Sequence, residues 1–288
     1  MRFLSLLGLS AFLASLGSAR PHEIVIAGDR MALQGDIVFS AGNARQRELY
    51  RCGPEGEGLK RLTRHGSLCV SPAVRAGTIA YTSYRSGWPD VYVQSLSGGP
   101  GRPILQVPGT SSGAALSPTG ERLALVLSRH GNPELYLTNT RGSGLKQLTR
   151  TYGLEASPAW APDGQRLVYV ASEGHSPQLY ILSASGGKPS LVPTGKSFCA
   201  DPSWSPDGRR LAFAVFGGGV SRIAVFSFAD RQTRLLASTS GCESPAWGNN
   251  SRHLAAVRRG DVVLIDSRSD SLRTLVAGRG ATSLDWGW

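Results

Sequence analysis

Short runs of hydrophobic residues recur along the whole chain, and turn-forming residues separate one run from the next. Six units align on one apolar anchor position, and successive anchors lie 42, 44, 44, 43 and 39 residues apart. Each unit holds four runs with the alternating or continuously apolar character of β-strands. A period near ~40 residues with four strands per period is typical of a β-propeller blade. The anchors are Val74, Leu116, Trp160, Trp204, Trp247 and Trp286.

The two ends of the chain supply complementary parts of one blade. Residues 281–286 form an innermost strand with no strands after it, whereas the first blade lacks its innermost strand. Pairing the two predicts an all-β, six-bladed β-propeller of four-stranded antiparallel blades over residues 35–288, its ring closed by the C-terminal strand. Closure removes exposed sheet edges. In the alternative, residues 24–28 fill that place and the C-terminal strand is left over. The other strands of the first blade are 36–41, 47–51 and 59–63.

The first nineteen residues have the character of a targeting signal. Met1-Arg2 supplies a positive start, residues 3–16 are apolar, and Gly17-Ser18-Ala19 offers a small-residue cleavage site. We therefore expect a signal peptide over 1–19, cleaved near Ala19, and a lead-in over 20–34. No later run approaches 18 apolar residues, so no membrane span is expected. The protein should be periplasmic or secreted.

Composition narrows the class of partner. Gly 36 and Pro 17 interrupt helices too often for an all-α fold. The net charge of +11 is compatible with nucleic-acid binding, but the basic residues are scattered and no block of five like charges occurs. A solvated, mixed surface is favoured, and no nucleic-acid partner is expected.

Several short motifs resemble those of a known family. Trp160-Ala-Pro-Asp-Gly164 and Trp204-Ser-Pro-Asp-Gly208 are similar to the W-S-P-D-G core of the TolB-type (PD40) propeller repeat. Leu-Thr at 62–63 and 148–149, and Leu-Tyr at 135–136 and 179–180, fit the same repeat. The resemblance implies a partner protein in the periplasm or envelope. TolB carries an α/β domain before its propeller. Only some 15 residues separate the predicted signal from the first blade here, so we expect the propeller alone.

Patterns that suggest catalysis have structural explanations. Gly109 to Gly113 matches G-x-S-x-G, but it lies between strands of a propeller unit with no helix after it, which indicates a chance match. The five histidines lack zinc-site spacing. Asp163 and Asp207 belong to Pro-Asp-Gly turns, where the carboxylate caps the turn. We expect no catalytic residue and no cofactor, with a divalent cation in the channel as an open alternative.

The repeat alignment predicts where each cysteine lies within its blade. Cys69, Cys199 and Cys242 each lie five residues before their anchor. Cys199 and Cys242 belong to neighbouring blades, so we expect both at the same channel mouth, where a disulfide could form after export. Free buried thiols are the equal alternative. A bridge between Cys52 and Cys69 is not expected, because they should lie at opposite ends of the blades.

Acidic residues begin the innermost strands of three consecutive blades. We expect Glu155, Asp201 and Glu243 to surround one sector of the channel mouth, where like charges favour a divalent cation or a segment carrying Lys or Arg. The alternative is a solvated rim without a ligand. Hydroxyls and loop residues should share that face: Ser111, Ser157, Ser244 and Ser283, with Trp88, Arg85, Arg129, His130, Tyr152 and His175.

The sequence as a whole favours binding over catalysis. It predicts an exported, monomeric, non-catalytic propeller that binds or scaffolds a protein of the bacterial periplasm or cell envelope. The alternative is a propeller hydrolase or lyase that acts at the channel mouth on a small or carbohydrate substrate.

Overall fold

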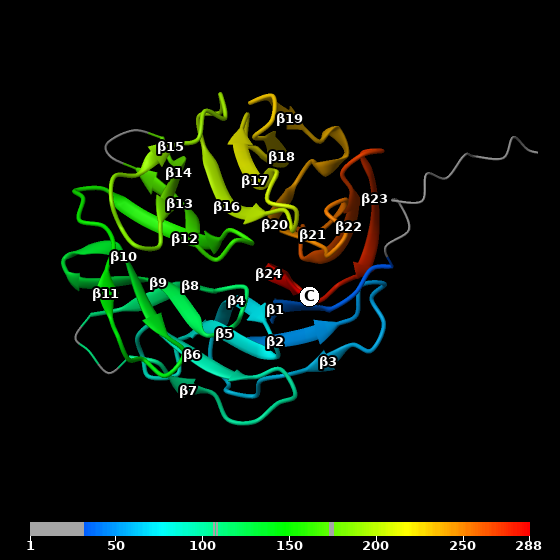
Figure 1. Ribbon diagram of the computed structural model, residues 1–288. Helices are drawn as coiled ribbons and strands as arrows, with labels where there is room; N and C mark the ends of the chain where they lie inside the picture. Colours follow the sequence, from blue (N-terminus) through cyan, green and yellow to red (C-terminus); the bar gives the residue numbers. More distant parts are fainter. Residues whose placement is uncertain (1–31, 106, 108, 173–175) are drawn as a thin grey trace, which may run out of the picture. The chain divides into compact units, whose positions relative to one another are not determined.

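The computed structural model describes residues 32–288 except 106, 108 and 173–175. The predicted signal peptide, the alternative strand at 24–28 and most of the lead-in lie outside the described residues. Six four-stranded antiparallel sheets stand around a central channel as the blades of a propeller (Figure 1). The predicted fold class is therefore confirmed. A short 3-10 helix, Ala237–Thr239, interrupts the strands once.

The strands of each blade run from the channel outwards in the order of the chain, except in blade 1. Blade 1 contains β24 (Ala281–Gly287), β1 (Asp36–Gly42), β2 (Arg47–Cys52) and β3 (Lys60–Arg61). Blade 2 contains β4 (Cys69–Arg75), β5 (Thr78–Ser83), β6 (Asp90–Ser95) and β7 (Arg102–Pro103). Blade 3 contains β8 (Ser111–Leu116), β9 (Arg122–His130), β10 (Asn132–Asn139) and β11 (Lys146–Gln147).

The second half of the ring repeats this pattern. Blade 4 contains β12 (Leu154–Trp160), β13 (Arg166–Ser172), β14 (Gln178–Ser183) and β15 (Ser190–Leu191). Blade 5 contains β16 (Cys199–Trp204), β17 (Arg210–Gly217), β18 (Val220–Ser227) and β19 (Thr233–Leu235). Blade 6 contains β20 (Cys242–Trp247), β21 (His253–Arg258), β22 (Asp261–Asp266) and β23 (Ser271–Val276).

The antiparallel order gives the propeller two different ends. Connections between blades, and between the second and third strands of a blade, lie at one end, which we call the loop face. Connections after the first and third strands lie at the other end, which we call the turn face. Among the described residues, no helix has the length and apolar character needed to cross a bilayer.

The C-terminal strand closes the ring. β24 pairs antiparallel with β1, with Ile37 opposite Trp286 and Phe39 opposite Leu284. These four side chains are buried and belong to one hydrophobic cluster. The innermost place of blade 1 is thus filled by residues from the far end of the chain, as the repeat alignment predicts.

Arginines and tryptophans join neighbouring blades. Arg122 lies over the Trp160 ring of the next blade, with its guanidinium carbon 4.6 Å from the ring centroid. Arg166 over Trp204 and Arg210 over Trp247 repeat the contact at 5.1 Å and 4.9 Å. Such contacts add cation–π attraction to the burial of the indole. The anchor tryptophans therefore pack blade against blade.

Removal of residues 281–288 tests the role of closure. The shortened chain should lose cooperative thermal unfolding, because β1 would expose an unpaired edge and the cluster around Ile37 would lose Leu284 and Trp286. A matched chain that lacks only Trp288 keeps β24 and should unfold cooperatively. Near-ultraviolet circular dichroism during heating checks both. Cooperative melting of the shorter chain near the full-length midpoint would show that closure does not depend on β24.

Candidate binding site in the propeller channel

A ring of small residues, all of them polar except one glycine, surrounds the channel. Each lies three positions before its anchor, and we call the six residues the collar. A register shift interrupts the pairing of β4, β8, β12, β16 and β20 at this level. Ser71, Ser157, Asp201 and Ser244 have φ angles of 47° to 50°, which non-glycine residues rarely adopt. The repeated bulge turns these residues toward the axis. The collar comprises Ser283, Ser71, Gly113, Ser157, Asp201 and Ser244.

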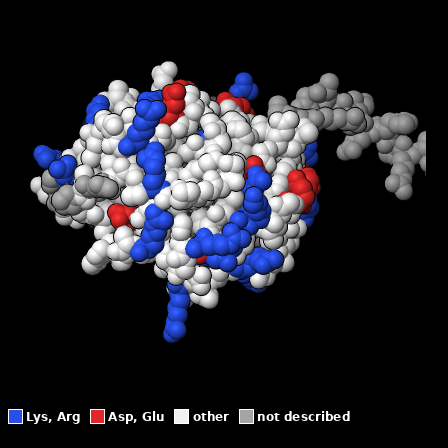
Figure 2. All heavy atoms as spheres, turned by 90° about the horizontal axis from the view of Figure 1, so that it is seen from below, with Lys and Arg blue, Asp and Glu red and all other residues white. Residues whose placement is uncertain are grey.

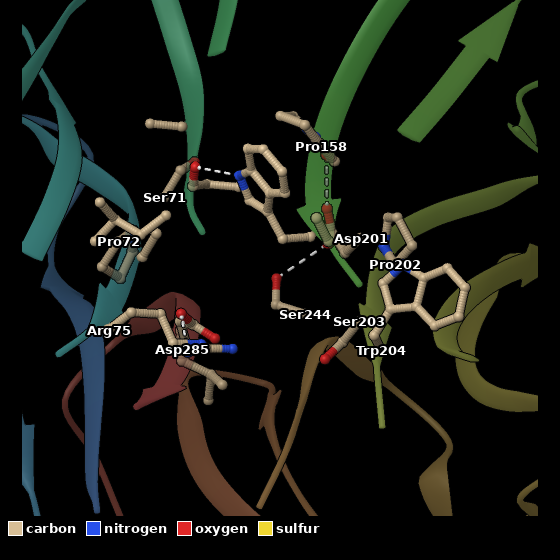
Figure 3. A pocket seen from close by; sticks show the side chains of 18 of the residues that line it. Ser71, Pro72, Arg75, Pro158, Asp201, Pro202, Ser203, Trp204, Ser244 and Asp285 are labelled. Atoms are coloured by element: carbon tan, nitrogen blue, oxygen red, sulfur yellow. Dashed lines mark hydrogen bonds and ion pairs between the residues drawn. The ribbon is translucent and has the colours of Figure 1, made fainter. Parts of the chain in front are cut away.

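Asp201 is the charged member of the collar. Its Oδ1 accepts a hydrogen bond from the Ser157 hydroxyl at 3.2 Å. Its Oδ2 accepts one from the Ser244 hydroxyl at 3.0 Å (Figure 3). The two serines belong to the blades on either side, so three consecutive blades orient one carboxylate. Asp201 is half-buried and lines the cavity. It can therefore pair with a cationic group inside the channel.

The channel becomes apolar toward the turn face. One position after the collar, four blades contribute buried prolines: Pro72, Pro158, Pro202 and Pro245. The indoles of Trp160, Trp204 and Trp288 continue this lining. Arg75 Nη1 pairs with Asp285 Oδ2 at 3.0 Å on the opposite wall (Figure 3). Prolines and pinned indoles give rigid apolar walls next to one charged, hydroxyl-rich ring.

Glu155 does not lie at the channel mouth, which corrects the prediction from sequence. Its residue is 2% exposed, and its Oε2 accepts hydrogen bonds from the Leu135 amide at 3.0 Å and from the Thr149 hydroxyl. It stands five positions before its anchor, where other blades have buried cysteines. The bulge lies between this position and the anchor, so side chains at this level face the core of the blade.

The burial of Glu155 changes its protonation. Burial raises the pKa of this carboxyl to about 7, and the nearby charge of Glu134 raises it further, whereas the hydrogen bond from Thr149 acts against the shift. Glu134 is also buried and accepts a 2.7 Å hydrogen bond from the Thr151 amide through Oε1. Its Oε2 is buried without a hydrogen-bond partner among the described residues. These two carboxyls hold the connection between blades 3 and 4.

Glu243 lies apart from Asp201. It lines a shallow hollow at the loop face of blades 5, 6 and 1, together with Phe216, Arg259 and Thr282. Asp201 faces the cavity that opens toward the turn face. The three acidic residues therefore occupy three environments and do not form one acidic mouth.

All four cysteines are buried and free in this structure, which matches the alternative of free thiols and not a bridge between Cys199 and Cys242. Cys199 packs in the cluster with Phe213, whereas Cys242 packs in a different cluster with Leu254. The position five residues before the anchor faces a core between blades. The two thiols therefore lie in separate cores. Burial raises the pKa of Cys242 to about 11 and also raises that of Cys199, which keeps both protonated.

Several predicted partner-binding residues are exposed on the loop face. Trp88 is 72% exposed, Tyr152 is wholly exposed, and Arg129 is exposed. Arg85 is exposed too, although its guanidinium lies 4.1 Å from the Tyr92 ring centroid and donates to the Gly101 carbonyl. Their role in partner binding stays a prediction. His175 lies outside the described residues, and so does the side chain of His130.

The serines expected at the channel mouth also lie in different environments. Ser111 is buried at the start of β8, where its Oγ accepts from the Val91 amide at 2.9 Å. No helix follows it, so the G-x-S-x-G match has no catalytic geometry. Ser157, Ser244 and Ser283 belong to the collar. Sequence reasoning missed Ser71 as a collar member, although comparing the third residue before each anchor would have found it.

Polar and charged groups in the channel come from the collar and from the Arg75–Asp285 pair. In the described part of the chain, no three His, Cys, Asp or Glu side chains form a group that could hold a metal ion. The collar offers hydrogen bonds and one negative charge. Lys and Arg side chains are spread over the side of the propeller in Figure 2, with few acidic side chains among them. The collar is therefore negatively charged, whereas the protein as a whole carries a net charge of +11.

Comparison with known proteins assigns the family. The model of the TolB beta propeller domain matches residues 25–281. The chain belongs to the TolB β-propeller domain family. A TolB homolog of Chlorobaculum tepidum is 36% identical over 77 residues, which cover 26% of this chain and 18% of the relative. The Tol-Pal system protein TolB of Desulfosudis oleivorans is 38% identical over 63 residues, 21% of this chain and 14% of the relative. The matched segments thus span less than a fifth of either relative.

Solved structures share the fold. TolB from Acinetobacter baumannii superposes with a TM-score of 0.77 at 23% identity, covering 88% of this chain and 67% of that one. Oligogalacturonate lyase from Vibrio parahaemolyticus has a TM-score of 0.56 at 12% identity, covering 83% and 79%. At these identities the likeness shows the architecture alone.

The raised pKa of Glu155 predicts a pH-dependent stability. Between the ordinary value of 4.5 and about 7, the folded protein holds a proton that the unfolded chain releases. This contribution to stability is fully present below pH 4.5 and is lost as the pH rises through 7. Glu155→Gln cannot ionise, so its free energy of unfolding relative to the native protein should increase from pH 5 to pH 8. Urea unfolding at both pH values measures the difference.

An exposed carboxyl provides the control for this measurement. Glu121 lies on the turn face and is exposed, so Glu121→Gln should show no comparable change in relative stability between the two pH values. An equal difference between Glu155→Gln and the native protein at pH 5 and pH 8 would mean that Glu155 ionises normally in the folded state.

Proposed function

We propose that this protein is an exported, non-catalytic propeller that binds an extended segment of a periplasmic or cell-envelope protein in its channel. Membership of the TolB β-propeller family and the signal-like segment at 1–19 support this assignment. The observation that carries it is Asp201, one carboxylate oriented by hydroxyls from both neighbouring blades inside a proline- and tryptophan-lined channel. We propose that the protein acts as a monomer.

The shape of the channel suits an extended peptide. Its walls come from the innermost strands of all six blades, so a ligand must enter along the axis. Flat indoles and proline rings pack against a peptide backbone without needing specific side chains. Because these walls are held by blade packing, little ordering cost opposes binding. A narrow rigid channel therefore selects a chain segment over a folded surface.

The charge of the channel sets the specificity of this proposal. The Ser157 and Ser244 hydroxyls donate to Asp201 and fix the plane of its carboxylate. A Lys or Arg side chain of the bound segment can then donate to the remaining acceptor positions. A hydrogen bond to a charged group contributes about 1.5–3 kcal/mol. A segment with one basic residue should therefore bind better than a neutral one.

Panning a random peptide library on the native protein tests the proposal, because such a library samples segments of every charge. Selected peptides should be enriched in Lys or Arg at one position, and Asp201→Asn should lose that enrichment and bind the selected peptides about 10- to 100-fold more weakly. Asp230→Asn makes the same chemical change on the exposed turn face and should bind like the native protein. Thermal midpoints of all three confirm folding.

Three outcomes would contradict the proposal. Equal binding by Asp201→Asn and the native protein would place recognition outside the collar. A thermal midpoint that rises with a divalent cation in the native protein but not in Asp201→Asn would assign the carboxylate to a metal ion. Selected peptides that bind the native protein but not Trp88→Ser would move the protein-binding site to the loop face.

A further inference from the structure

Exposed hydrophobic side chains gather on the loop face, away from the channel site. In the described part of the chain, Trp88 is 72% exposed, Tyr152 is wholly exposed and Leu154 is 64% exposed. Tyr84 and Phe198 add smaller exposed areas on the same face. Leu154 begins β12, and the other four residues lie in the connections of blades 2 to 5. Scattered single exposures are ordinary, but several on neighbouring loops of one face indicate an interaction surface.

Hydrogen bonds connect these loops into one continuous surface. The Ser111 amide donates to the Pro89 carbonyl at 3.0 Å, next to Trp88, and the Ser128 amide donates to the Thr110 carbonyl at 2.9 Å. Asn132 Nδ2 then donates to the Thr151 carbonyl at 3.1 Å, next to Tyr152. The tips of blades 2, 3 and 4 therefore lie side by side along the rim of the loop face.

The apolar tips are held in place from below. The Ser86 hydroxyl hydrogen-bonds to the Trp88 carbonyl at 3.1 Å and to Asp90 Oδ2 at 3.0 Å. The Thr151 amide is held by buried Glu134. The exposure of Trp88 and Tyr152 is thus a feature of ordered loops. Side chains this exposed protrude from the surface, which suits a soft, deformable partner.

The same loops are basic. Segments 64–68, 84–90, 128–132, 150–154 and 193–198 carry five basic residues and one acidic residue, Asp90. Arg64, Arg129 and Arg150 are exposed, and no ion pair of theirs occurs among the described residues. The basic residues are Arg64, Arg85, Arg129, Arg150 and Lys196.

We propose that the loop face of blades 2 to 4 docks on an anionic lipid surface. Aromatic side chains with polar tips favour the boundary between headgroups and acyl chains, and Arg and Lys are attracted to anionic headgroups. Trp88, Tyr152 and Leu154 enter this boundary, and Arg64, Arg129 and Arg150 pair with the headgroups. This places the opposite turn face, toward which the channel cavity opens, away from the membrane.

Vesicle sedimentation with the full chain tests this inference. The native protein should bind vesicles of equal parts phosphatidylglycerol and phosphatidylcholine at least tenfold more strongly than vesicles of phosphatidylcholine alone. Raising the salt from about 0.1 M to 1 M shortens the screening length from about 10 Å to about 3 Å and should release the protein. Trp88→Ser with Tyr152→Ser, and separately Arg129→Glu with Arg150→Glu, should each weaken binding at least tenfold.

Matched controls separate the loop face from general surface effects and from the N-terminal segment, which every variant retains. Leu191→Ser with Leu235→Ser removes exposed leucines from the outer strands, and Lys188→Glu with Arg231→Glu reverses two charges on the turn face. Both pairs should bind vesicles within twofold of the native protein. Asp201→Asn should also bind vesicles normally, so failure here is independent of the channel proposal.

Three results would overturn the inference. Equal binding to the two vesicle types would remove the role of anionic headgroups. Unchanged binding by both loop-face double variants would place lipid contact elsewhere, including the N-terminal segment. Binding of the protein to soluble polyglutamate, with no binding to vesicles, would assign the basic loops to an acidic protein segment.

Discussion

Pairing between β24 and β1 is the constraint on which the other features depend. It joins residues from opposite ends of the chain and brings the sixth innermost strand to the axis. Only a closed ring brings all six collar residues, five of them at bulges of the innermost strands, around a single channel. The ring also leaves each blade packed between two others, so the cores lie between sheets. Closure therefore determines both stability and the shape of the candidate site.

Contacts between neighbouring blades serve two purposes at once. Arg122, Arg166 and Arg210 each cover an indole of the next blade on the turn face. Nearer the axis, Asp201 accepts hydrogen bonds from serines on both of its neighbours. The carboxylate is thus oriented before any ligand arrives, which lowers the cost of binding. The same arrangement explains how a basic protein presents a negative, rigid interior.

Much of the fold could be predicted from the sequence because the residues that define the repeat are the ones that pack in the cores. The anchor spacing and the incomplete first blade predict six blades and closure by residues 281–286, as observed. The site was predicted less well. Aligning Glu155 with the cysteines gives its level along the strand, but the bulge decides that this level faces the core. Asp201 lies at the bulge itself, where side chains turn into the channel. A repeat alignment alone does not show whether a side chain faces the core or the channel.

Site-specific photo-crosslinking in cells tests most directly whether the channel holds a protein segment. A photoreactive phenylalanine analogue at Trp288 replaces one exposed aromatic side chain that lines the cavity with another. The same analogue at Leu191, on the outer strand of blade 4, provides the comparison. Binding in the channel predicts a light-dependent adduct with one envelope protein from position 288, lost with Asp201→Asn, and none from position 191. Adducts from position 191 alone, or an adduct at 288 that persists with Asp201→Asn, would contradict it.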